Sequence, residues 1–326
     1  MAYTTIDNPE LYFQCKNYSG NNSTNAITFD GSEDMSPNMV WLKGRSGADN
    51  HRLYDTLRST SSLVPNDNRA EQADGNFSSF NSDGFTITGT DTGWNGSGET
   101  YVSWNWKETA TAGFDIVAYT GTGSSNAVSH SLSATPNMII IKNRDDSDSW
   151  YAWHQGLGAV ASNYINLDTS GAKSSVSDGI TAISSSNFTV NTRGDVNASS
   201  EKYIAYCFAD VKGYSKIGSY TGNGNADGTF VYTGFKPAWV MVKRTDAAAD
   251  WFIRDNKQDP ENVMNEYLSP NTTATSGNLD SFDFISNGFK IRNSNNAWNG
   301  SGNTYIYLAF AESPFVNSKG VPTNAR

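Results

Sequence analysis

The sequence contains three copies of one pattern, and this internal repetition constrains the fold more than any other feature. Three apolar segments begin at residues 36, 135 and 236: SPNMVWLK, TPNMIIIK and KPAWVMVK. Three further segments begin at residues 99, 201 and 303: ETYVSWNW, EKYIAYCF and NTYIYLAF. The pentapeptide WNGSG occurs at 94–98 and 298–302, and the related VNASS lies between them at 196–200. Copies of about 100 residues are longer than solenoid repeats and have the size of small domains.

We therefore expect three homologous domains in tandem, with a short segment at each end. The repeats are placed at residues 15–110, 114–211 and 214–313. Residues 1–14 precede the first repeat and are interpreted as an N-terminal docking arm, and residues 314–326 form a polar C-terminal tail.

Each copy has the pattern of short β-strands. In YVSWNWK the alternate positions hold Val102, Trp104 and Trp106, and the other two copies alternate in the same way. Such alternation is typical of a strand with one face on a core. Clusters of Gly, Asn, Asp and Ser separate the apolar runs, and the best helical candidate is one or two turns within 259–268. The predicted fold is all-β, with three jelly-roll-like β-sandwiches.

The PNMVWLK strand and its two counterparts are apolar on both faces. A strand of this kind must be covered on both sides. One face can point into its own sandwich, and the other is a candidate contact with a sister repeat or another subunit. This favours close, pseudo-threefold packing of the repeats, although a linear rod also remains compatible with the sequence. The candidate interface residues are Met39, Trp41, Met138, Ile140, Trp239 and Met241.

Charge and composition argue against several classes of partner. The formal net charge of −10 disfavours nucleic acid, since phosphate binding needs clustered Lys and Arg. No apolar run is long enough to insert into a membrane, and the N-terminus lacks the basic and apolar regions of a signal peptide. Cys15 and Cys207 lie at non-equivalent places in their repeats. We expect both to be reduced and buried, as in a reducing cytoplasm.

No catalytic residue, cofactor or metal site is predicted. The three histidines do not share one repeat position, and His51 aligns with Trp150 and Trp251, so it is not a shared catalytic base. No zinc spacing, phosphate-binding loop or nucleophile elbow occurs. A group of aspartates could bind calcium, but the first repeat lacks it, which favours an acidic turn. These residues are Asp145, Asp146 and Asp148.

The loop tryptophans next to asparagine are the candidates for ligand binding. An exposed indole beside amide groups suits stacking on a sugar. The competing and favoured interpretation is that the indole caps the edge of the sandwich. The four residues are Trp94, Asn95, Trp298 and Asn299.

A resemblance to a known group of proteins is carried by two long segments. They are YIAYCFADVKGYSKIGSYTGNGNADGTFVYTGFKPAWVMVKRTD at 203–246 and TYIYLAFAESPFV at 304–316. Both resemble the tandem β-rich repeats in virion proteins of tailed bacteriophages that infect marine bacteria, and the similarity extends over all three repeats. The group supplies no catalytic residues to carry over.

The resemblance implies a structural or adhesive virion protein that is assembled in the host cytoplasm. The expected role is a tail-fibre or tail-appendage component that contacts the host surface without covalent chemistry. Its expected partners are other virion proteins, further copies of itself (fibres of this kind are commonly trimers) and a host surface glycan or protein. A head-surface or neck decoration protein is the first alternative, and a polysaccharide-degrading enzyme is the second.

Overall fold

The computed structural model describes residues 3–323, and nearly all of the regular structure in this range is antiparallel β-sheet. Four short helical turns accompany the strands: η1 (Pro9–Leu11), η2 (Ala110–Ala112), η3 (Gln155–Leu157) and α1 (Gly194–Asn197). No helix in the described range is long and apolar enough to cross a membrane.

Each repeat contributes an inner sheet in which four strands have the same order. In the first repeat the order is β1 (Phe13–Ser19), β7 (Thr100–Trp106), β3 (Met39–Gly44) and β4 (Arg52–Asp55). The second has β8 (Phe114–Thr120), β16 (Lys202–Phe208), β10 (Met138–Asn143) and β11 (Tyr151–His154), extended by β12 (Asn163–Asn166) and β13 (Ser174–Ser175). The third has β17 (Ser215–Thr221), β24 (Thr304–Pro314), β19 (Phe235–Arg244) and β20 (Trp251–Asp255).

An outer sheet covers one face of each inner sheet. The first repeat has β2 (Asn25–Ile27), β6 (Phe85–Ile87) and β5 (Phe77–Phe80). The second has β9 (Asn126–Ser129), β15 (Asn187–Val190) and β14 (Ile180–Ile183). The third has β18 (Phe230–Tyr232), β23 (Gly288–Ile291), β22 (Gly277–Ile285) and β21 (Met264–Tyr267). A separate apolar cluster joins the two sheets of each repeat, so the all-β sandwich expected from the sequence is confirmed.

The prediction of a helical turn within residues 259–268 is wrong. Residues 264–267 instead form strand β21, whose partner is β22. The residues before it form a loop with no helical turn.

The second face of every inner sheet points to the middle of the molecule. There the three repeats share one buried cluster, in which Trp104, Tyr206 and Leu308 occupy equivalent positions. All six interface candidates, Met39, Trp41, Met138, Ile140, Trp239 and Met241, belong to this central cluster. The opposite face of the same strands, with Val40, Ile139 and Val240, faces the outer sheets.

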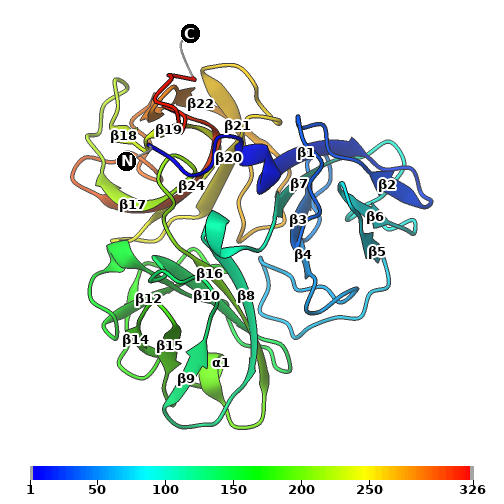
Figure 1. The fold of residues 1–326 in the computed structure, drawn as a ribbon, viewed down its shortest axis with the longest axis vertical. Helices are drawn as coiled ribbons and strands as arrows, with labels where there is room; N and C mark the ends of the chain where they lie inside the picture. Colours follow the sequence, from blue (N-terminus) through cyan, green and yellow to red (C-terminus); the bar gives the residue numbers. More distant parts are fainter. Residues whose placement is uncertain (1–2, 324–326) are drawn as a thin grey trace.

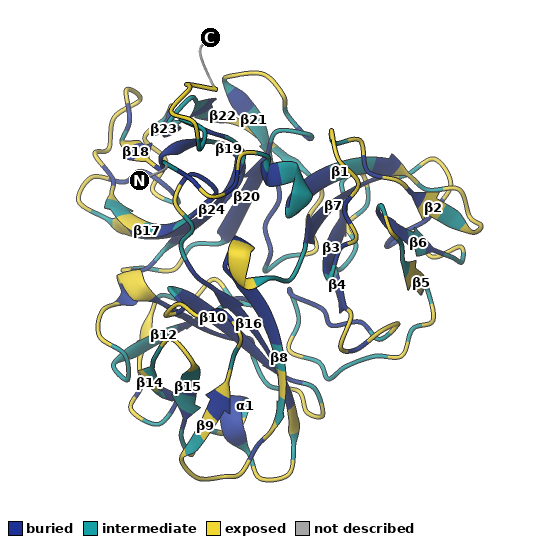
Figure 2. Ribbon diagram, viewed as in Figure 1, coloured by how far each residue is buried: buried dark blue, intermediate teal, exposed yellow. Residues whose placement is uncertain are grey.

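The three repeats therefore close around a common centre instead of forming a rod. Figure 1 shows them as three lobes, blue to cyan on the right, green below and yellow to red at the upper left. In Figure 2 the buried strands gather where the lobes meet. Aromatic rings connect the lobes there: the ring centroids of Trp106 and Trp239 are 5.7 Å apart, and those of Phe208 and Phe310 are 6.1 Å apart.

A hydrogen bond at the last residue of β4, β11 and β20 connects each repeat to the next. Asp55 Oδ2 accepts from the Tyr206 hydroxyl at 2.7 Å. His154 Nε2 lies 3.1 Å from the Tyr307 carbonyl oxygen. Trp104 Nε1 donates to Asp255 Oδ2 at 2.9 Å, which returns the series to the first repeat. One strand position therefore makes all three contacts, with a side chain of the facing repeat in two cases and with a backbone carbonyl in the third.

A second set of contacts explains why histidine replaces tryptophan at residue 51. Trp150 Nε1 donates to the Val64 carbonyl and Trp251 Nε1 to the Asn166 carbonyl, both at 3.0 Å. His51 Nε2 lies 3.0 Å from the Ser269 carbonyl oxygen, and its Nδ1 accepts from Trp41 Nε1 at 3.0 Å. Imidazole and indole thus each supply one ring N–H to a carbonyl of the preceding repeat.

The segment expected to be an N-terminal docking arm packs on the body of the protein. Ile6 is buried in the central cluster, and the Tyr3 hydroxyl donates to the Gly234 carbonyl at 2.8 Å. Ser318 of the C-terminal tail donates its N–H to Asp7 Oδ1 at 2.6 Å. Residues 1–2 and 324–326 lie outside the described range.

Candidate functional site

The tryptophan–asparagine pairs are buried, which fits the favoured interpretation of an indole that caps the sandwich edge and contradicts the alternative of an exposed ligand-binding surface. Trp94 is 3 % exposed and Trp298 is 1 % exposed, while Asn95 and Asn299 have no exposed surface. Arg52 lies 4.8 Å from the Trp94 ring centre and Arg254 lies 4.7 Å from that of Trp298. Neither indole has a free face on which a sugar could stack.

The asparagine of this motif holds together turns that are distant in sequence. Asn95 Nδ2 donates to the carbonyls of Ser23 at 2.6 Å and Gly89 at 2.9 Å, and its Oδ1 accepts the Asn21 N–H at 3.1 Å. Asn197 and Asn299 make the corresponding contacts in the other repeats. The motif recurs because each sandwich needs this buried amide to satisfy three backbone groups.

A glycine at the end of the first strand completes the same junction. A Cβ atom added to Gly20 would lie 2.2 Å from the Gly96 carbonyl oxygen. At Gly121 and Gly222 the same distances, to the carbonyl oxygens of Ala198 and Gly300, would be 2.0 Å and 2.3 Å. Any side chain would push the backbone of the asparagine turn away, which accounts for NYSG, AYTG and SYTG as a second repeated motif.

The aspartates after β10 form a turn. Asp145 Oδ2 accepts the Lys202 N–H at 2.8 Å, and Asp148 Oδ2 accepts from Asn143 Nδ2 at 2.8 Å. Asn143 Oδ1 accepts the N–H groups of Asp145 and Asp146. Within residues 3–323 no group of three or more His, Cys, Asp or Glu is arranged to hold a metal ion. Cys15 and Cys207 are free thiols and are buried.

Two of the three histidines are buried structural groups. Burial lowers the pKa of His154 to about 4, and it lowers the pKa of His51 well below its ordinary value. Both rings are occupied by the contacts between repeats, so neither imidazole is free to take a proton from a substrate.

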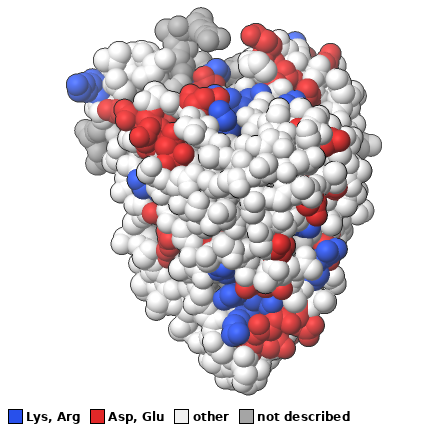
Figure 3. Space-filling view, turned by 90° about the vertical axis from the view of Figure 1, so that its right-hand side faces the viewer, with Lys and Arg blue, Asp and Glu red and all other residues white. Residues whose placement is uncertain are grey.

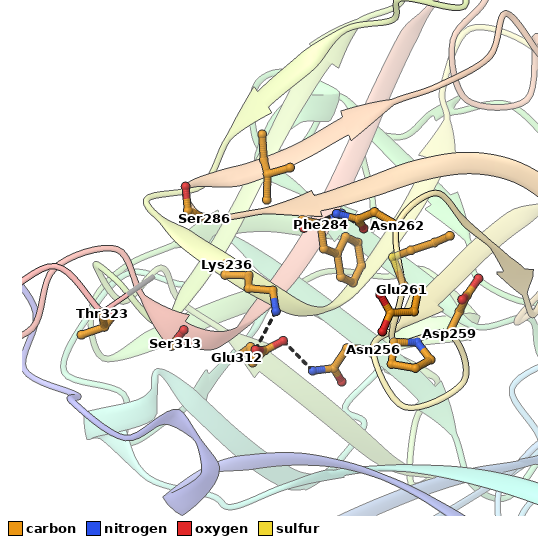
Figure 4. Close-up of a pocket in the computed structure, with 13 residues that line it drawn as sticks. Lys236, Asn256, Asp259, Glu261, Asn262, Phe284, Ser286, Glu312, Ser313 and Thr323 are labelled. Carbon is orange, nitrogen blue, oxygen red and sulfur yellow. Dashed lines mark hydrogen bonds and ion pairs between the residues drawn. The ribbon is translucent and has the colours of Figure 1, made fainter. Parts of the chain in front are cut away.

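An open cavity with a volume of about 580 Å³ lies at the outer end of the third repeat. Figure 4 shows that its walls come from the loop after β20, the turn after β22, the end of β24 and the C-terminal tail. This volume is typical of sites for small ligands. The side chains that carry charge here are Lys236, Asp259, Glu261 and Glu312.

Glu312 is held in a fixed position on one wall of the cavity. Lys236 Nζ lies 2.7 Å from Glu312 Oε1, and Asn256 Nδ2 donates to Oε2 at 2.9 Å (Figure 4). On the opposite wall Asn262 pairs with the Phe284 backbone through bonds of 2.9 Å and 3.0 Å. Glu261 lies on the same loop and is exposed.

The segments that line the cavity belong to the third repeat and the C-terminal tail. In the other repeats the residues equivalent to Glu312 are Glu108 and Asp210, which accept backbone N–H groups from the strand that follows. The segments that directly follow β4 and β11, residues 56–63 and 155–162, contain no acidic residue, whereas the segment after β20 carries Asp259 and Glu261. Sequence reasoning did not select these residues, although the segment DPEN at 259–262 departs from the repeated pattern.

The lining suits a polar ligand rich in hydroxyl groups. Carboxylate oxygens accept hydrogen bonds from hydroxyls, and the Lys236 ammonium donates them. With three carboxyl groups and one ammonium, the cavity disfavours anionic ligands.

Comparison with known proteins identifies the family of the chain but no individual relative. No curated protein matches the sequence. One family model, described as a domain of unknown function, matches residues 8–314 and so includes all three repeats. The chain therefore belongs to the DUF7483 family.

Proposed function

We propose that the protein is a structural and adhesive component of a bacteriophage virion, in a tail fibre or tail appendage that contacts the host surface. Support comes from the resemblance of residues 203–246 and 304–316 to virion repeat proteins. The single structural observation behind the proposal is the closed central cluster, in which every repeat uses one face to hold the other two. A body of this kind is rigid and presents loops outward, which suits non-covalent recognition.

The surface is compatible with this role. Figure 3 shows small, scattered groups of acidic and basic side chains on a face that is otherwise uncharged. The cavity beside Glu312 is the proposed contact point for a host glycan, and other virion proteins and further copies of the chain are the proposed structural partners. Repetition of the chain in an oligomer would multiply weak contacts into avidity.

Two experiments on whole particles test the proposal. Electron microscopy of virions labelled with antibody against this protein should place it on the tail, and purified protein should compete with virions for adsorption to host cells. Label on the head or neck would favour the decoration-protein alternative. Absence of the protein from purified virions would reject a virion role.

The cavity is tested separately by a matched pair of variants. Glu261→Gln should weaken competition for adsorption, because it removes a negative charge and replaces one of two acceptor oxygens at the cavity with a donor. Glu33→Gln changes an exposed glutamate in the first repeat and should compete like the unaltered protein. Equal competition by both variants would show that this cavity does not take part in adhesion.

The enzymatic alternative has its own measurement. Purified protein is incubated with host polysaccharide, and new reducing ends are assayed. We expect none. Release that disappears in Glu261→Gln or Glu312→Gln would replace the adhesive proposal with a hydrolytic one.

A further inference from the structure

The outer sheet of the third repeat carries two aromatic side chains on its solvent-facing surface. Phe230 and Tyr232 stand on the edge strand β18 and are 44 % and 55 % exposed, whereas Val231 between them points into the core. Within residues 3–323 no other aromatic side chain is exposed. Figure 1 shows β18 on the outer side of the third lobe. An exposed aromatic pair in a chain that covers its other rings calls for an explanation outside the core.

The other two repeats carry small residues at these positions. The central residue of each edge strand pairs with a core phenylalanine of the next strand, which aligns β18 with β9 and β2; the pairs are Val231–Phe289, Val128–Phe188 and Ile27–Phe85. By this alignment, alanine corresponds to Phe230 in both other repeats, and a hydroxyl residue corresponds to Tyr232. The four residues are Ala26, Ala127, Thr28 and Ser129. An equivalent sheet forms twice without either ring, so strand pairing does not require them.

Both rings are held in place by their surroundings. Phe230 leans over Gly288 of the neighbouring strand, where an added Cβ atom would lie 3.0 Å from Phe230 Cε2. The Tyr232 hydroxyl lies 3.2 Å from the Tyr3 hydroxyl, which itself donates to the Gly234 carbonyl. Side chains that are already ordered lose little conformational entropy when a ligand binds.

The two rings are continuous with the open cavity of the third repeat. Gly288 pairs with Tyr232 on one side and with Ile285 on the other, and Ile285 lines the cavity. Residues that pair directly across strands point to the same face of a sheet. Because the Phe230 ring lies over Gly288, an apolar stripe runs from Tyr232 through Phe230 to Ile285 at the cavity wall. Adjacent strands are about 5 Å apart, so the stripe extends about 10 Å beyond the cavity.

We propose that this stripe and the cavity form one extended site for a neutral oligosaccharide, in which one sugar enters the cavity and the following sugars stack on Phe230 and Tyr232. The inference rests on the proposed adhesive function and specifies its ligand. The C–H face of a pyranose is apolar and matches the electron-rich face of an aromatic ring. Lys290 and Asp227, an ion pair beside Phe230, supply hydrogen-bonding groups for the sugar hydroxyls.

The exposed rings are too small a surface for a second protein chain. Two rings that are about half exposed offer on the order of 200 Å² of apolar surface. A stable protein–protein interface buries about 800 Å² on each partner. The ion pair of Arg292 with Asp283 borders the stripe on the next strands and limits its width. The size of the patch therefore favours a glycan over a protein.

A size series of host glycan tests the length of the ligand. Envelope polysaccharide of the host is cleaved by partial acid hydrolysis and separated into fractions of one to six sugars. Each fraction is then used to inhibit the binding of fluorescently labelled protein to host cells. We expect fractions of three or more sugars to inhibit at concentrations about tenfold lower than single sugars. Equal inhibition by all fractions, or inhibition by none while the protein still binds cells, would overturn the extended site.

Two substitutions test the rings with residues that another repeat already carries. Phe230→Ala and Tyr232→Ser should fold, because Ala127 and Ser129 occupy the same positions in a formed sheet. Together they should weaken the affinity for the three-sugar fraction about tenfold, as measured by calorimetry. Leu57→Ala changes an exposed apolar residue of the first repeat and should leave this affinity unchanged. Tyr232→Phe keeps the ring and should bind like the unaltered protein.

The outcomes separate this site from the adhesive function. If the doubly substituted protein binds cells and glycan like the unaltered protein, the stripe is not part of the site, while adhesion stands. If the unaltered protein does not bind host cells, the proposed function fails and this inference fails with it. A change of elution volume in size-exclusion chromatography on substitution would assign the rings to a contact between copies of the chain and would overturn the glycan site.

Discussion

The centre of the molecule and the cavity of the third repeat differ in how they use the repeated sequence. At the centre, each repeat supplies the same positions, and the contacts of Asp55, His154 and Asp255 close a ring. At the cavity, the loop at 259–262 departs from the pattern of the other two repeats. Glu312 keeps the acidic type of its equivalents but contacts Lys236 and Asn256 instead of the backbone of a following strand.

This difference separates residues that build the fold from residues free to acquire a role. A side chain whose equivalents make the same buried contact three times is explained by packing, whether it is tryptophan, asparagine or histidine. A polar group that appears in one repeat only, and lines an open cavity, has no such explanation. Repetition in this chain therefore marks structure, and departures from repetition mark the candidates for function.

The largest effect is expected from the central cluster. Trp104→Ala should lower the free energy of unfolding by about 3–5 kcal/mol, because it opens a cavity and removes a hydrogen bond to buried Asp255. Leu308→Ala, at the equivalent position, is the matched control and should cost less since no buried carboxylate loses a donor. Urea unfolding measures both. A loss below about 1 kcal/mol for Trp104→Ala would contradict a shared core.

A smaller effect on stability is expected at each of the three asparagine turns. Asn95→Ala, Asn197→Ala and Asn299→Ala should each cost about 2 kcal/mol, because each leaves buried backbone groups without partners. The three costs should agree closely, as the three turns are built alike. A large cost at one site with none at the others would show that the repeats are not equivalent here. Thermal unfolding provides the comparison.

Acid should weaken the junction that contains His154. The pKa of this group is lowered to about 4 by burial, so the unfolded state binds its proton first as the pH falls below about 6.5. The neutral His154 ring makes its full contribution to the free energy of unfolding above that pH. This contribution should decline by about 1–3 kcal/mol toward pH 4.

Other groups titrate in the same range, so a variant isolates the histidine. Burial raises the pKa of Asp195 to about 6, which acts in the opposite direction. His154→Gln keeps a side-chain donor and removes the titration. The difference in melting temperature between this variant and the unaltered protein should therefore change with pH, and a constant difference would argue against a neutral buried imidazole.

The smallest effect on stability is expected at the cavity. Glu261→Gln should change the free energy of unfolding by less than about 0.5 kcal/mol, because the side chain is exposed. Its effect should be confined to adsorption. A loss of stability comparable to that of the asparagine variants would place Glu261 among the structural residues and weaken the contrast between the two regions.

The sequence predicted the parts of the fold that alternate in hydrophobicity. The strands around Trp104, Tyr206 and Leu308 were found because period-two patterns survive in all three copies. The second apolar face of the PNMVWLK strand already pointed to a contact beyond its own sandwich, and the structure puts all three copies of that face in the central cluster.

The candidate site was predicted poorly, for a physical reason. Trp94 and Asn95 stand among turn residues, which usually lie at the surface, and local sequence does not show that Arg52 and Ser23 cover them. The cavity depends on segments more than 50 residues apart, such as Lys236 and Glu312, and one sequence carries no direct sign of that proximity. Only the break in the repeat pattern at 259–262 was visible in advance.

Differential scanning calorimetry of the full chain tests most directly whether the three repeats are one body with a single centre. A shared core predicts one transition whose van't Hoff enthalpy equals the calorimetric enthalpy. Three resolved transitions, or a van't Hoff enthalpy near one third of the calorimetric value, would mean that each repeat folds alone and would contradict the shared core.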